Sequence, residues 1–114
     1  MKIIEMSREL TAAERYHLTM SPAVQKMKNA KNQTISMSAW AVYIDTDKDG
    51  KEQTVLSILS DNGEIFATNS PTFINDFGRM TDLFHDAGEE VKAITVISGM
   101  SKAGREFITC VYAG

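Results

Sequence analysis

The chain has 114 residues, of which 43% are hydrophobic and 24% are charged, and its 15 acidic and 12 basic residues give a formal net charge of −3. This length corresponds to one domain of about 100–200 residues, and the composition excludes a wholly disordered chain. The single cysteine excludes an internal disulfide and a zinc site made of several thiolates. The acidic excess argues against attraction of nucleic acid to the whole surface, but it allows a local basic stripe.

The compartment is predicted from segments that the sequence lacks. No apolar run approaches the roughly 20 residues that span a bilayer. The first six residues lack the long apolar core of a secretory signal. Together with the single free cysteine, these features predict a protein of a reducing cytoplasm with no membrane partner.

Residues 1–32 are expected to form an N-terminal helical arm. Thr11 and Glu14 have the spacing of a capping box, which predicts a helix that runs to about Met20. Pro22 ends that helix and suits the first position of a second short one. The end of the arm is basic, and we expect it to help bind a polyanion through Lys26, Lys28 and Lys31.

Residues 33–114 are expected to form the main β-rich part of a single folding unit. Strands are predicted over residues 34–45, 54–60, 64–68, 91–98 and 105–112, and an amphipathic helix begins at Pro71 and ends at Gly88. Five strands with a helix between the third and the fourth is the order of an OB-fold, a small and partly open barrel. The predicted class is therefore α+β, mainly β, with an OB-like barrel after the helical arm.

The first of these strands is long, and its apolar pattern changes phase. The apolar positions are first odd (Ile35, Met37) and then even (Trp40, Val42). A β-bulge or a strong bend moves the buried face of a strand in this way. A bent first strand suits a barrel in which one strand serves two sheets.

Motifs for catalysis or metal binding are weak. The segment from Asp45 to Gly50 resembles the start of a calcium loop, but the twelfth position, where that loop needs glutamate, is Leu56. We interpret the segment as an acidic hairpin turn. Cys110 lies in an apolar strand with no base at a recognisable spacing. We therefore expect no enzyme activity, no metal and no cofactor.

The loop over residues 99–106 has two glycines at the spacing of a P-loop, but it lacks the Lys-Ser/Thr pair and precedes a strand. Nucleotide hydrolysis is therefore not predicted. Two interpretations of Lys102 and Arg105 remain open. They either contact a phosphodiester backbone, with help from Lys51, or are the solvated charges of a plain hairpin.

Three strand aromatics are candidates for stacking on nucleobases: Trp40, Tyr43 and Phe107. Such stacking is worth about 1–3 kcal/mol per base. The alternative for each ring is a place in the core. Trp40 and Tyr43 are three positions apart, so a regular strand would put them on opposite faces and expose at least one.

Four segments of the sequence carry a resemblance to known proteins: Leu10-Thr11 with Glu14-Arg15-Tyr16, Leu18 to Pro22, Phe66 to Ile74, and Ser101 to Cys110. These segments resemble small single-stranded DNA-binding proteins encoded by phages and prophages of Gram-positive bacteria, and the resemblance implies a bacterial host cell. The resemblance covers nearly the whole chain, and it implies an OB-type fold that coats single-stranded DNA during replication or recombination. It also implies phage or host replication and recombination proteins as partners.

Cellular proteins of this function usually end in a flexible acidic tail that recruits partners. This sequence instead ends directly after a predicted strand, so recruitment of partners through a tail is not expected. Self-association is expected, since coating of a strand is commonly cooperative.

The sequence therefore predicts a sequence-tolerant single-stranded DNA-binding protein without enzymatic activity. The alternative is an acidic interaction module, or DNA mimic, that inhibits a host or defence factor.

Overall fold

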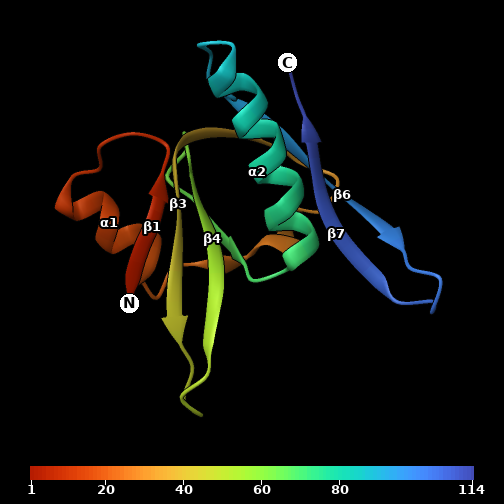
Figure 1. The fold of residues 1–114 in the computed structure, drawn as a ribbon, viewed down its shortest axis with the longest axis horizontal. Helices are drawn as coiled ribbons and strands as arrows, with labels where there is room; N and C mark the ends of the chain where they lie inside the picture. Colours follow the sequence, from red (N-terminus) through yellow and green to blue (C-terminus); the bar gives the residue numbers. More distant parts are fainter.

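The computed structural model describes residues 1–114 and shows a mixed α+β protein made mostly of strands, with two helices and a curled, open sheet (Figure 1). Neither helix is long and apolar enough to cross a membrane. A short 3₁₀ helix, η1, lies between the second and third strands. The elements in chain order are β1 (Lys2–Met6), α1 (Ala12–Thr19), β2 (Gln25–Lys26), η1 (Met27–Ala30), β3 (Thr34–Thr46), β4 (Glu52–Ser60), β5 (Ile65–Thr68), α2 (Pro71–Asp86), β6 (Ala93–Met100) and β7 (Glu106–Tyr112).

The sheet is organised around β3, which pairs with three other strands. The strand order is β2-β5-β4-β3-β6-β7, and β1 also pairs with β3. β6 pairs with the first residues of β3 (34–36), whereas β1 pairs with residues 41–44. One long strand therefore joins two parts of the sheet that diverge from each other.

The phase change predicted in β3 is confirmed as an irregularity in its pairing. The register with β4 shifts between Met37 and Ala39. Before the shift Ile35 faces the larger core, and after it Val42 does, while Ala39 and Ala41 face a smaller cluster. At this shift β3 has one residue more than β4. The extra residue changes which alternate side chains of β3 face the larger core.

The larger core lies between α2 and the inner side of the curled sheet. Ser70 caps α2 by accepting a hydrogen bond from the Phe73 amide, and Pro71 occupies the first helical position. The predicted apolar stripe of the helix is confirmed, since Phe73 and Phe77 are fully buried in this core. Gly88, two residues after the end of α2, has a positive φ of 74°, a conformation that favours glycine.

The N-terminal segment is more than a helical arm. The capping box and the helix after Thr11 are confirmed, but Lys2–Met6 forms a strand on β3, and no second α-helix follows Pro22. Leu10 and Leu18 are buried against Ala39 and Ala41 of β3. A strand that depends on a partner about 40 positions away leaves little local signal.

The number of strands also differs from the prediction, because the sheet has seven strands instead of five. No pairing joins β5 to β7. β5 pairs with the short β2 instead, and β7 packs beside α2, where the Thr109 hydroxyl bonds to the Asp76 carboxylate. The sheet therefore curls without closing.

Candidate nucleic-acid interface

The hairpin between β6 and β7 extends away from the core (Figure 1). Its turn is held within itself, since the Ser101 amide donates to the Arg105 carbonyl at 2.8 Å and the Arg105 amide donates to the Ser101 hydroxyl at 3.2 Å. Gly104 adopts a φ of 78°, which a residue with a side chain rarely adopts. The side chains of Lys102 and Arg105 are exposed and make no ion pair, so both cations are free to bind an anion.

Phe107 lies across Gly99 on the neighbouring strand. The two residues are directly paired in the register of β6 and β7. A Cβ atom added to Gly99 would lie 2.8 Å from Cζ of Phe107, so the ring occupies the space that a side chain at position 99 would need. Phe107 remains 37% exposed. The hairpin thus presents an aromatic ring two residues from Arg105.

One further cation, Lys31, reaches this hairpin from the position that directly follows η1. Nζ of Lys31 lies 3.3 Å from a carboxylate oxygen of Glu106, the first residue of β7. The Lys31 amide donates to the Lys28 carbonyl, and residues three apart in a 3₁₀ turn lie on one side. The structure therefore brings Lys31 to the hairpin that carries Lys102, Arg105 and Phe107. We group these four residues with Lys28, three positions before Lys31, and call the group the basic face.

Three of the other four predicted residues lie apart from the basic face. Lys26 is exposed in β2, which pairs with β5. Lys51 follows the turn between β3 and β4, a hairpin that points to a different corner of the molecule from the β6–β7 hairpin (Figure 1). Tyr43 is only 5% exposed, and burial raises the pKa of its hydroxyl. A ring enclosed in this way has no free surface for a base, so Tyr43 is removed from the candidate interface.

Trp40 is partly buried and belongs to a different site. Its indole packs edge-to-face on Phe77 of α2, with ring centroids 5.2 Å apart. It also lines an open cavity of about 610 Å³ that includes the end of β1, the irregular part of β3, the start of β6 and the last turns of α2. Trp40 is therefore at the opposite end of β6 from Lys102 and Arg105.

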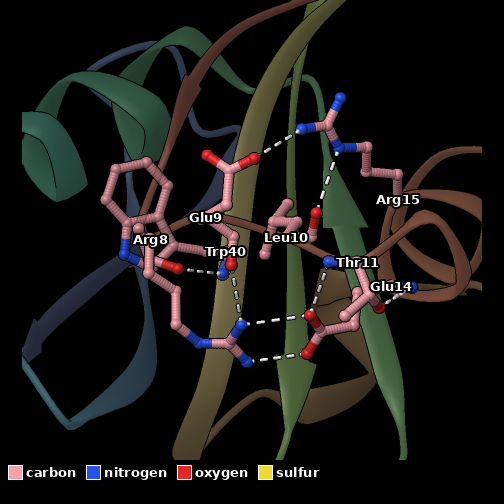
Figure 2. Close-up of polar contacts among 8 residues, drawn as sticks. Arg8, Glu9, Leu10, Thr11, Glu14, Arg15 and Trp40 are labelled. Atoms are coloured by element: carbon pink, nitrogen blue, oxygen red, sulfur yellow. Dashed lines mark hydrogen bonds and ion pairs between the residues drawn. The ribbon is translucent and has the colours of Figure 1, made fainter.

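The loop after β1 borders this cavity and is fixed by polar contacts. The Arg8 guanidinium bonds to both carboxylate oxygens of Glu14, at 3.0 and 2.7 Å, and this pairing lowers the pKa of Glu14 to about 2. Glu14 also accepts from the Thr11 amide at 2.9 Å. Figure 2 shows the guanidinium of Arg8 pointing toward Glu14 and away from the ring of Trp40.

The other motifs of the sequence have structural explanations. The predicted hairpin turn at Asp45–Gly50 is confirmed, since the Asp47 carboxylate accepts from the Asp49 and Lys51 amides. Cys110 is buried in the larger core, and desolvation raises the pKa of its thiol to about 12. No group of three or more metal-binding side chains is close enough to hold an ion.

Sequence reasoning missed Gly99 and the residues around the cavity. Gly99 matters only because the register of β6 and β7 sets it opposite Phe107, and register is not visible in one strand alone. Comparisons with protein-family models, curated proteins and solved structures found no match to this chain.

Proposed function

We propose that the protein binds single-stranded DNA in a sequence-tolerant way and that the basic face is its contact surface. The observation that carries the proposal is the Phe107 ring, which lies over Gly99 beside two unpaired cations. A ring in that place offers a stacking surface, and cations around it can follow the phosphates. Stacking is independent of base identity, because every base has a π-face.

The distribution of charge supports this choice of surface. The segment 27–31, which contains η1, and the β6–β7 hairpin together hold four of the twelve basic residues. They hold one of the fifteen acidic residues, Glu106. A chain with a net charge of −3 can therefore attract a polyanion locally while the rest of its surface repels one.

The strand arrangement supports an OB-like interpretation of the sheet. β3, β4 and β5 form an antiparallel meander, β6 returns to pair with β3, and α2 lies between β5 and β6 in the chain. In OB-folds the loop between the last two strands contributes to oligonucleotide binding. The corresponding loop here is the one with Lys102 and Arg105. The family resemblance of the sequence points to the same ligand.

The test is a titration of labelled oligo-dT, followed by fluorescence anisotropy at several salt concentrations, for the wild type and for Lys102→Ala with Arg105→Ala. Each phosphate contact to a single strand contributes about 0.7 to the slope of log K against log salt, so loss of two contacts should reduce the slope by about 1.4. Duplex DNA should bind more weakly, since its bases are stacked on each other.

The matched control is Lys2→Ala with Lys48→Ala, which removes two exposed charges outside the basic face. The control should keep the affinity and the salt slope of the wild type. Equal losses of affinity in the two double variants would mean that DNA is attracted by overall charge, and this result would contradict the proposed surface. Absence of oligo-dT binding by the wild type at low salt would contradict the function itself.

A further inference from the structure

The cavity beside Trp40 has the size of a binding pocket, although the proposed DNA contacts do not use it. Its volume of about 610 Å³ falls within the roughly 300–1,000 Å³ typical of ligand sites. It lies at the point where β1 and β6 diverge along β3, so its walls come from four separate elements. Ser7, Arg8, Asp61 and residues 89–92, in the segments that follow β1, β4 and α2, complete the walls.

Part of the pocket wall is apolar and held by the core. Trp40 and Met37 both line the cavity and pack against the larger core cluster. The contact with Phe77 fixes the plane of the indole. An indole held in this way provides a π-face for a cation or an apolar group.

The remaining wall is strongly acidic. Five carboxylates line the cavity, against two basic residues, Arg8 and Lys92, and one histidine, His85. Arg8 is already paired with Glu14, which lies outside the lining. None of the five carboxylates forms an ion pair or a side-chain hydrogen bond within the chain. They are Glu5, Asp61, Asp82, Glu89 and Glu90.

These charges define which ligands fit. A phosphate or a DNA strand would be repelled, because the excess of carboxylates gives the cavity a negative potential. A chelated metal ion is also excluded, since no three of these groups lie close enough to hold one. A cation that extends over several ångströms and has an apolar or planar portion can contact both the apolar part of the wall, with Trp40, and the acidic part.

We propose that this cavity is the docking site for a basic segment of a partner protein, with an arginine side chain against Trp40 and its neighbours near the carboxylates. The guanidinium is planar and weakly hydrated, and it stacks on aromatic rings better than an ammonium does. The charge complementarity between an arginine-rich segment and the five unpaired carboxylates supplies the attraction.

The experiment uses a short oligoarginine peptide and the fluorescence of Trp40, which is the only tryptophan of the chain. The peptide should cause a saturable change in Trp40 emission that weakens as salt rises. An oligoglutamate of the same length should cause none. A change of Trp40 emission with protein concentration alone would place a second copy in the cavity and overturn the proposal.

A pair of double variants locates the contact. Glu89→Gln with Glu90→Gln removes two exposed carboxylates from the cavity, and it should weaken peptide binding by about tenfold, the upper part of the range for two exposed charge pairs. Asp49→Asn with Glu52→Gln removes two exposed, unpaired carboxylates near the β3–β4 turn, and it should change the affinity less than about twofold. Equal effects of the two variants would overturn the proposal.

Discussion

Gly99 determines where the ring of Phe107 lies. The ring rests in the space that a Cβ atom would fill, at 2.8 Å from Cζ, so Gly99→Ala must push the ring aside. Because Phe107 lies near the turn of the hairpin and is 37% exposed, the ring can swing into solvent at little cost in stability. We predict that Gly99→Ala weakens binding of oligo-dT by about 1–3 kcal/mol, the usual contribution of one stacked base.

The measurement is an oligo-dT titration together with thermal denaturation. Gly78→Ala is the control, because a Cβ atom there meets nothing within 4 Å. Alanine within α2 should stabilise the fold by about 0.5–1 kcal/mol and leave DNA binding unchanged. If Gly99→Ala binds as the wild type does while Phe107→Ala loses affinity, the ring does not need its place over Gly99.

At the scale of elements, the carboxylate of Glu14 holds the conformation of the loop between β1 and α1, because it bonds to Arg8 and to the Thr11 amide. The Glu14→Gln variant keeps the capping hydrogen bonds, since glutamine also serves at this position, but it loses the charge that pairs with Arg8. The folded-state pKa of Glu14 is lowered from 4.5 to about 2. Its stabilising charge is therefore fully present above pH 4.5 and disappears as the pH falls through about 2.

Thermal denaturation of both proteins between pH 7 and pH 2 tests this prediction. The Tm of Glu14→Gln should be lower than that of the wild type at pH 7, and the difference should shrink below pH 4.5. Glu9→Gln, which removes the partner of Arg15 at 3.3 Å, controls for the loss of a negative charge near the same helix. A difference that stays constant down to pH 2 would mean that the ion pair with Arg8 contributes nothing.

The elements that the sequence predicts well are those with a strong local pattern. The stripe of Phe73 and Phe77 predicts α2, and the phase change in β3 predicts its irregular pairing with β4. β1 and the pairing of β2 with β5 depend on partners far along the chain, and single-sequence patterns do not record them. The residues of the candidate site also divide into those with a local signal and those whose place depends on the fold. Local charge identifies Lys102 and Arg105, whereas only the folded chain separates Trp40 from them.

At the scale of the whole molecule, charge is separated along β6. The cavity includes Ala93 at the start of the strand, and the cations Lys102 and Arg105 follow its end at Met100. Seven steps of about 3.3 Å put these ends roughly 23 Å apart. Because the Debye length is about 10 Å at 0.1 M salt, charges at one end have little effect on a ligand at the other.

This separation leads to a prediction about crossed variants. Glu89→Gln with Glu90→Gln should bind oligo-dT with the affinity of the wild type, although it loses affinity for oligoarginine. Lys102→Ala with Arg105→Ala should show the reverse pattern. Separate titrations of each variant with each ligand at 0.1 M salt provide the measurement, and they avoid direct binding of the peptide to DNA. If one variant weakened both ligands by the same factor, the basic face and the cavity would act as one surface, and the assignment of two sites to opposite ends of β6 would be wrong.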